Sequence, residues 1–288
     1  MTIHWTALGI LLVLAMLAHL AAAAALGLRW RGAGHAAFAG GLALAAGAFV
    51  VRWVEVRHLP MQNLFEVFLS MGMLMYPLSL FCRRFLGVRG QAADAFIGFV
   101  VLLPAALVFN PDPQRLPPAL QSPLFAPHVA AYLFAYVIMA KAAVHAVLAL
   151  AAGEPRPGRW SDFVAGLRAA LEALSDRSRP REPRDRAASE RAAYRMAGLG
   201  FPLLTLGLVL GAWWGKLAWG DYWHWDPKEL WSLVSWLLFL GYFHVRFRLG
   251  PRYPRLAAAL VVCGFGAIVI TLLWVNLARI FAGLHSYA

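Results

Sequence analysis

The sequence has 288 residues, of which 61% are apolar and only 14% carry a charged side chain. A soluble domain carries roughly 25% charged residues, so this composition argues against a soluble globular protein and predicts a membrane protein. The formal net charge is +12, but the basic residues lie between apolar runs rather than in one patch, which argues against nucleic-acid binding.

Eight apolar runs are long enough to cross the hydrocarbon core of a bilayer, which is about 30 Å thick and needs roughly 20 helical residues. The predicted fold class is therefore all-α, a polytopic membrane helix bundle of about eight transmembrane helices in a single integral membrane domain, 1–288. The first run lacks a basic start, so we expect a membrane span there rather than a cleavable signal. In chain order the runs are 4–28, 36–54, 64–81, 92–109, 129–151, 195–215, 229–247 and 256–279.

The basic residues predict the orientation of these helices. Connections on one side of the predicted membrane hold 19 of the 26 lysines and arginines, and those on the other side hold six. Because the side rich in Lys and Arg is normally cytoplasmic, both termini and the connection 213–231 are predicted to lie outside the cytoplasm. The Arg-rich connection 152–194 is predicted to be cytoplasmic, and apolar residues at helical spacing within it predict an amphipathic helix on the inner membrane surface.

Seven of the twelve tryptophans lie between Trp213 and Trp236. Within this stretch, Asp226 followed by Pro227 and Glu229 predicts a helix start, with an N-cap, a first-turn proline and a capping box. One interpretation of the indoles is an aromatic belt at the membrane interface. The other is a platform for a large flat ligand, because stacked rings contribute about 0.5–1.5 kcal/mol per pair beyond burial. The local density of indoles favours the platform.

Two histidines are predicted to lie level with these indoles, His128 at the outer start of the fifth helix and His285 beyond the outer end of the eighth. Imidazoles on both faces of a planar macrocycle would give bis-histidine haem ligation. The alternative, two solvated histidines at the membrane interface, stays open on these grounds. His224 lies inside the tryptophan-rich stretch and is either a spare ligand or a polar rim residue, of which we favour the rim.

The segment WGDYWHWDPKELW resembles the tryptophan-rich signature of the cytochrome c assembly family of haem-handling membrane proteins, of the CcsA/ResC type. The segments LPMQNLFEVFLS, SPLFAPHVAAYLFAY and GLHSYA resemble further segments of that family. The likeness covers about residues 58–288, the assembly core, apart from the Arg-rich connection, and leaves 1–57 as two additional N-terminal transmembrane helices. Eight predicted helices favour this type over a shorter, six-helix relative that delivers haem.

The resemblance implies roles for individual residues. His128 and His285 would be external axial ligands of the haem iron, and His244 would be an intramembrane ligand that holds haem on its way across. Arg246 and Arg248 would then pair with propionates at that inner site, although an interface histidine remains the alternative at position 244. The external haem platform would consist of Trp213, Trp214, Trp219, Trp223, Trp225, Asp226 and Glu229.

The function implied by the resemblance is that of a haem-handling subunit of a cytochrome c synthase in the bacterial inner membrane. Haem b, bound transiently as substrate, would be presented on the outer face for thioether attachment to an apocytochrome c. Its other implied partners are a ResB-type membrane protein, thiol-reducing proteins and membrane lipid. Whether the chain itself catalyses the attachment stays open, as do a haem exporter or chaperone and a non-catalytic membrane scaffold.

Overall fold

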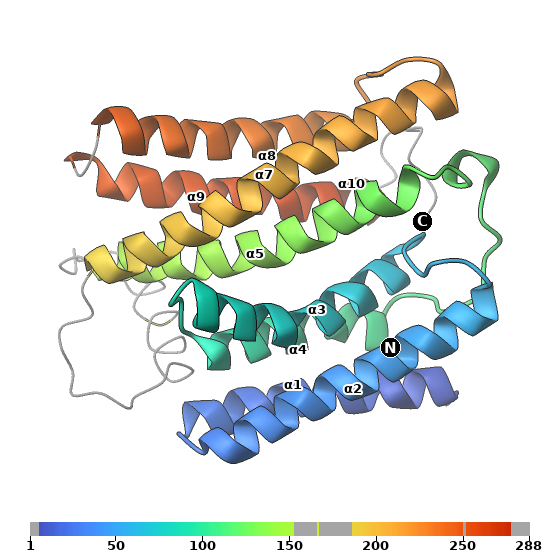
Figure 1. The fold of residues 1–288 in the computed structure, drawn as a ribbon, viewed down its shortest axis with the longest axis horizontal. Coiled ribbons are helices and arrows are strands. Elements are labelled where there is room, and N and C mark those ends of the chain that lie inside the picture. The colour runs from blue at the N-terminus through green and yellow to red at the C-terminus, as the bar shows by residue number, and fades with distance from the viewer. Residues whose placement is uncertain (1–5, 153–165, 167–185, 250–251, 278–288) are drawn as a thin grey trace. The chain divides into compact units, whose positions relative to one another are not determined.

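The structure, a computed structural model, describes residues 6–152, 166, 186–249 and 252–277. Over these residues the chain folds into helices joined by turns and irregular connections, without strands, which confirms the predicted all-α class (Figure 1). The histidine at position 285 and the predicted amphipathic helix of the Arg-rich connection lie outside the described residues.

All eight predicted apolar runs form helices. Seven are long and apolar enough to cross a membrane, whereas α4 has only 17 residues and would extend about 25 Å. Five-residue π-helical segments, η2 (Val245–Leu249) and η4 (Ile270–Trp274), continue α8 and α9, and α10 (Val275–Leu277) follows η4. The helices are α1 (Ala7–Gly27), α2 (Arg31–Val56), α3 (Leu64–Phe85), α4 (Gln91–Leu107), α5 (Phe125–Ala151), α7 (Arg186–Trp219), α8 (Pro227–His244) and α9 (Pro254–Val269).

Helix α7 differs most from the prediction, because it is longer at both ends than the apolar run 195–215. Its first turns are polar but rich in alanine, and Arg186 pairs with Glu190 at 2.9 Å one turn later, so local propensity extends the helix beyond its apolar part. At the other end it continues to Trp219. The connection 213–231 is therefore mostly helical, and only residues 220–226 form a turn between α7 and α8.

The chain divides into two compact units between Leu116 and Pro117. In the N-terminal unit, α1 packs against α2 and α4, and α3 packs against the same two helices. In the C-terminal unit, α5 packs against α7 and α9, and α8 packs against the same two helices. Each unit is thus a ring of four helices. Because the chain reverses direction at each connection, helix ends gather at both ends of each ring.

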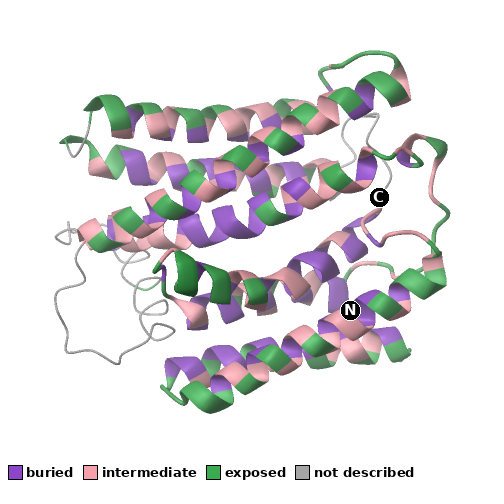
Figure 2. Ribbon diagram, in the orientation of Figure 1, coloured by how far each residue is buried: buried purple, intermediate pink, exposed green. Residues whose placement is uncertain are grey.

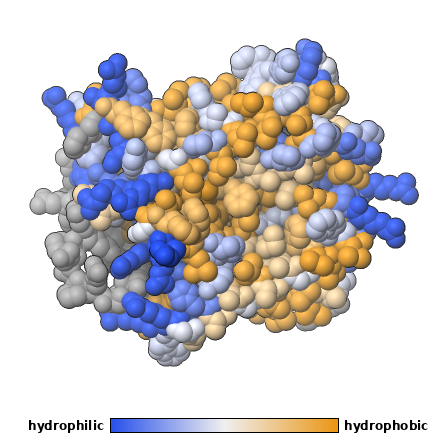
Figure 3. All heavy atoms as spheres, viewed as in Figure 1, coloured by the Kyte–Doolittle hydropathy of each residue, from blue (hydrophilic) through white to orange (hydrophobic). Residues whose placement is uncertain are grey.

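The helices expose apolar side chains as membrane spans do. In the C-terminal unit, α5 buries most of its residues, while α7 and α8 leave many side chains exposed along their length (Figure 2). On the face drawn in Figure 3, apolar residues gather over the middles of the helices and hydrophilic residues gather towards their ends. Exposed apolar middles with polar ends are the pattern expected for helices that face lipid.

Candidate functional site

His128 lies in the first turn of α5 with its imidazole held by the backbone of α7. Its Nδ1 lies 2.8 Å from the carbonyl oxygen of Gly207. A carbonyl can only accept a hydrogen bond, so Nδ1 carries the proton and the lone pair is on Nε2. Metal-binding histidines commonly donate their other ring N–H to a backbone carbonyl in this way. The hydrogen bond to Gly207 thus fixes the tautomer and the orientation of this imidazole.

Two glycines on α7 make room for this imidazole. A Cβ atom on Gly211 would lie 2.5 Å from Cε1 of His128, and a Cβ on Gly207 would lie 3.1 Å from the ring of Tyr132. The Tyr132 ring meets His128 edge-on, with 5.0 Å between ring centroids. The absence of side chains at both positions lets α5 and α7 approach closely enough for the hydrogen bond to form.

A row of four rings leads from His128 to the turn between α7 and α8; we refer to it as the ring row. The centroid of His128 lies 5.7 Å from that of Trp214, which lies 4.8 Å from that of Trp219. Trp219 meets His224 edge-on at 6.1 Å. Trp214 is only 2% exposed, and its indole N–H donates to the carbonyl of Ala119 at 2.8 Å. Trp214 therefore packs beneath the other rings of the row and has no indole face exposed for a ligand.

Other indoles of the predicted platform are exposed. Trp213 and Trp225 are 53% and 69% exposed, and Trp223 packs edge-on against Trp225 at 6.0 Å. Trp225 has a φ of +57°, in the left-handed region that non-glycine residues seldom occupy and that costs of order 1–3 kcal/mol. The turn thus holds a large exposed indole in an unfavourable backbone conformation, which indicates use of its surface rather than packing.

Two acidic side chains fix the turn, as the predicted capping box requires. Asp226 Oδ1 accepts from the backbone N–H of Lys228 at 2.9 Å. Glu229 Oε2 accepts from the backbone N–H groups of His224 and Asp226, at 2.8 and 3.2 Å. Both halves of the box are present, so this prediction is confirmed. The predicted platform members Asp226 and Glu229 shape the turn that carries the indoles.

Replacing Asp226 with alanine should lower the free energy of unfolding by about 0.5–2 kcal/mol, because α8 loses its N-cap acceptor. The measurement is thermal unfolding of the purified protein in detergent. Asp226→Asn keeps an acceptor oxygen and serves as the control, with a midpoint close to that of the parent. Equal midpoints for the two variants would contradict the capping role.

The buried polar atoms of this turn include Nε1 of Trp223 and Nδ1 of His224, which lack a hydrogen-bond partner in the part of the chain that the structure describes. The nearest acid to the imidazole is Glu229, with 4.0 Å between His224 Nδ1 and Oε1. Because buried polar atoms are nearly always bonded, these two point to a partner beyond the described residues, which suits a polar ligand group.

His244 lies apart from the ring row. It is the last residue of α8, at the opposite end of the C-terminal unit from the turn, and it is exposed. Arg246 lines a separate cleft in which His244 takes no part. The structure thus brings His128 together with the tryptophans but does not group His244 with Arg246. The pairing of His128 with the histidine at position 285 stays a prediction.

Arg52 and Glu66 form a buried ion pair that the sequence analysis missed. The Nε of Arg52 lies 2.9 Å from Glu66 Oε1, and the two side chains are 0% and 1% exposed. The guanidinium also donates to the carbonyls of Pro111 and Asp112, which ties the proline-rich connection after α4 to the N-terminal unit. The available signal was an arginine within the apolar run 36–54, where a charge needs a partner. We call this set the Arg52 clamp.

Comparison with known proteins gives a consistent family. The model of the family described as "Cytochrome C assembly protein" matches residues 42–282. A protein named "Cytochrome c biogenesis protein CcsA" from Synechococcus sp. (strain JA-3-3Ab) is 34% identical, covering 84% of this chain and 81% of its own. The protein of that name from Guillardia theta is also 34% identical, covering 82% of this chain and 79% of its own.

Among solved structures, the chain is similar to "Cytochrome c Heme Lyase CcmF", with a TM-score of 0.67 and 19% sequence identity. The match covers 94% of this chain and 47% of that one, so the chain spans about half the length of that structure. At this level of identity the likeness shows that the helical fold is shared.

Proposed function

Because the chain belongs to the cytochrome c assembly protein family, we propose that it presents haem for covalent attachment to apocytochrome c. Its apolar helices and its CcsA relatives make it a multi-pass membrane protein with a role in cytochrome c maturation. The observation that carries the proposal is the imidazole of His128, whose Nδ1–H is bonded to a carbonyl while the ring packs on Trp214. A hydrogen bond of this kind supports a histidine that binds haem iron.

In this function haem b is a substrate held transiently. His128 binds the iron through Nε2, and the resemblance assigns the opposite face to the histidine at position 285. The exposed indoles of Trp213 and Trp225 provide flat apolar surfaces for the porphyrin. The N–H of Trp223 and the imidazole of His224 offer polar atoms to the propionates. These side chains bind and orient haem at the end of the C-terminal unit that carries the turn.

The attachment reaction takes place between the vinyl groups of haem and the cysteine thiols of the apocytochrome. Each cysteine of a Cys-x-x-Cys-His segment adds sulfur and hydrogen across one vinyl group, so the thiols must be reduced but no oxidant is consumed. The protein's contribution is to hold the ring with its vinyl edge accessible, which lowers the entropic part of the barrier. Thiol-reducing proteins and a ResB-type membrane partner complete the proposed pathway, with the site on the outer side of a bacterial inner membrane.

Co-expression of the chain, a ResB-type partner and an apocytochrome c tests the proposal. We expect the purified complex to show Soret absorbance and the cytochrome to carry haem that survives denaturation. Bound haem without covalent product would identify a haem exporter or chaperone instead. A complex without Soret absorbance would refute haem handling of either kind.

Replacing Gly211 with alanine should weaken haem binding by about tenfold, because the added methyl group displaces the His128 ring from its hydrogen bond to Gly207. Affinity is measured by haem titration of the purified protein. Gly241→Ala is the matched control, since a Cβ there meets nothing within 4 Å. Equal affinities for the two variants would contradict the role of this glycine.

A further inference from the structure

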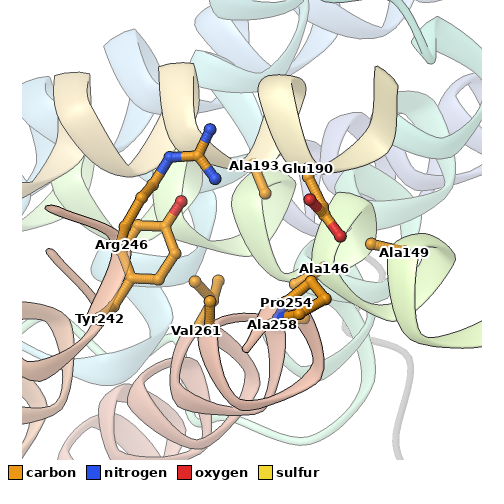
Figure 4. Close-up of a pocket in the computed structure, with 10 residues that line it drawn as sticks. Ala146, Ala149, Glu190, Ala193, Tyr242, Arg246, Pro254, Ala258 and Val261 are labelled. Carbon is orange, nitrogen blue, oxygen red and sulfur yellow. The ribbon is translucent and has the colours of Figure 1, made fainter. Parts of the chain in front are cut away.

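A second site lies in the C-terminal unit, at the end opposite the ring row. A narrow cleft is formed there by α5, α7, α9 and the junction of α8 with η2. Its floor consists largely of small side chains such as Ala193 and Ala258, and its polar groups are Glu190, Tyr242 and Arg246. In Figure 4 the side chains of Arg246 and Tyr242 extend side by side along the cleft, and Glu190 points into it from α7.

Arg246 is the residue in this cleft whose hydrogen-bond donors lack acceptors in the described residues. Its guanidinium lies 4.5 Å from the ring centroid of Tyr194 and is half-buried. Within the described ranges it makes no hydrogen bond or ion pair. A guanidinium has five N–H donors in a planar fork that matches the oxygens of a phosphate or carboxylate. The π-helical segment that carries Arg246 is an uncommon local structure that occurs frequently at functional sites.

The surrounding charge favours an anion. Glu190 is paired with Arg186 at 2.9 Å, which offsets its negative charge and leaves the positive charge of Arg246 in the cleft. The hydroxyl of Tyr242 is a further donor beside the guanidinium. The alanine floor of the cleft suits the first carbons below a head group.

The position of the cleft in the fold favours a phospholipid head group as the anion. The cleft lies where the membrane-capable segment Pro227–Leu249 ends and the segment Pro254–Trp274 begins. That is the level of the lipid head groups, where Arg and Tyr side chains commonly lie and where basic pockets between helices bind phospholipids. We propose that the cleft binds the phosphate of a phospholipid head group, with Arg246 as its principal donor. By the distribution of basic residues this is the cytoplasmic leaflet.

The test is the phospholipid content of the full-length protein purified in mild detergent, measured by native mass spectrometry. We expect the parent to retain phospholipid and Arg246→Gln to lose it about tenfold more readily on detergent washing, as loss of a charge-assisted contact predicts. Arg248→Gln, an exposed arginine two residues away, should retain it. Ala193→Leu fills the cleft without changing its charge and should also lose the phospholipid. The two variants Arg246→Gln and Ala193→Leu therefore test the proposal independently if one of them fails to fold.

Three results would overturn the proposal. The first is equal phospholipid retention in all four proteins. The second is displacement of the phospholipid by inorganic phosphate at equal concentration, which would make free phosphate the ligand. The third is loss of Soret absorbance in Arg246→Gln with phospholipid retained, which would assign the arginine to a haem propionate. Phospholipid retention is read independently of haem, so failure here leaves the proposed function untouched.

Discussion

Replacing His128 with alanine is expected to weaken haem binding by at least about 100-fold, because the iron loses an axial nitrogen while the surrounding indoles remain. Added imidazole should restore part of the Soret absorbance by occupying the vacated position. The measurement is a haem titration of the purified variant, with its thermal midpoint recorded to establish that the fold is intact.

His58→Ala provides the matched control for this variant. His58 also hydrogen-bonds to a backbone carbonyl, that of Leu59, but it belongs to the N-terminal unit and touches no ring of the ring row. Its loss should leave haem affinity unchanged. If His128→Ala binds haem as the parent does, or if imidazole restores nothing, His128 is not an iron ligand and the proposed function loses its main support.

Replacing Arg52 with leucine should lower the free energy of unfolding by about 3–5 kcal/mol, because it leaves the carboxylate of Glu66 buried without its cation. The carbonyls of Pro111 and Asp112 lose their donor in the same step. For a protein of ordinary stability this is a large fraction of the total. We expect a strongly lowered thermal midpoint in detergent and a reduced yield of folded protein.

A second substitution separates the ion pair from simple packing. In Arg52→Leu combined with Glu66→Leu, no buried charge is left unpaired, so stability should recover in part. Arg57→Gln, an exposed arginine just beyond α2, should behave as the parent. If the double variant is as unstable as the sum of its single variants, Arg52 and Glu66 are not energetically coupled.

The helices could be predicted from the sequence because their signals are local. Apolar runs of sufficient length located all eight, and the Asp226 capping box located the start of α8 to the residue. The start of α7 was missed because hydropathy does not register a polar, alanine-rich segment that continues a membrane span. The end of α7 could not be predicted because the tryptophans after residue 213 indicate a connection with a platform, whereas in the structure they continue the helix to Trp219.

The candidate site could be predicted only in part, because its decisive contacts join residues far apart in sequence. His128 was identified as a ligand, but its partner Gly207 lies 79 residues away and contributes only a carbonyl. The sequence places Trp214 in the external haem platform by resemblance alone and does not show that packing buries its indole against His128. The Arg52 clamp was missed for the same reason, since its acceptors at positions 111 and 112 are backbone atoms.

The carbonyl that fixes the tautomer of His128 has a consequence for how this protein can vary. Every amino acid supplies a main-chain oxygen, so no replacement at position 207 can delete the acceptor. An added apolar side chain there or at position 211 acts through its volume, because its Cβ would meet the ring of Tyr132 or of His128. The hydrogen bond that selects the tautomer is thus independent of the side chain at position 207, so long as the two helices keep their spacing.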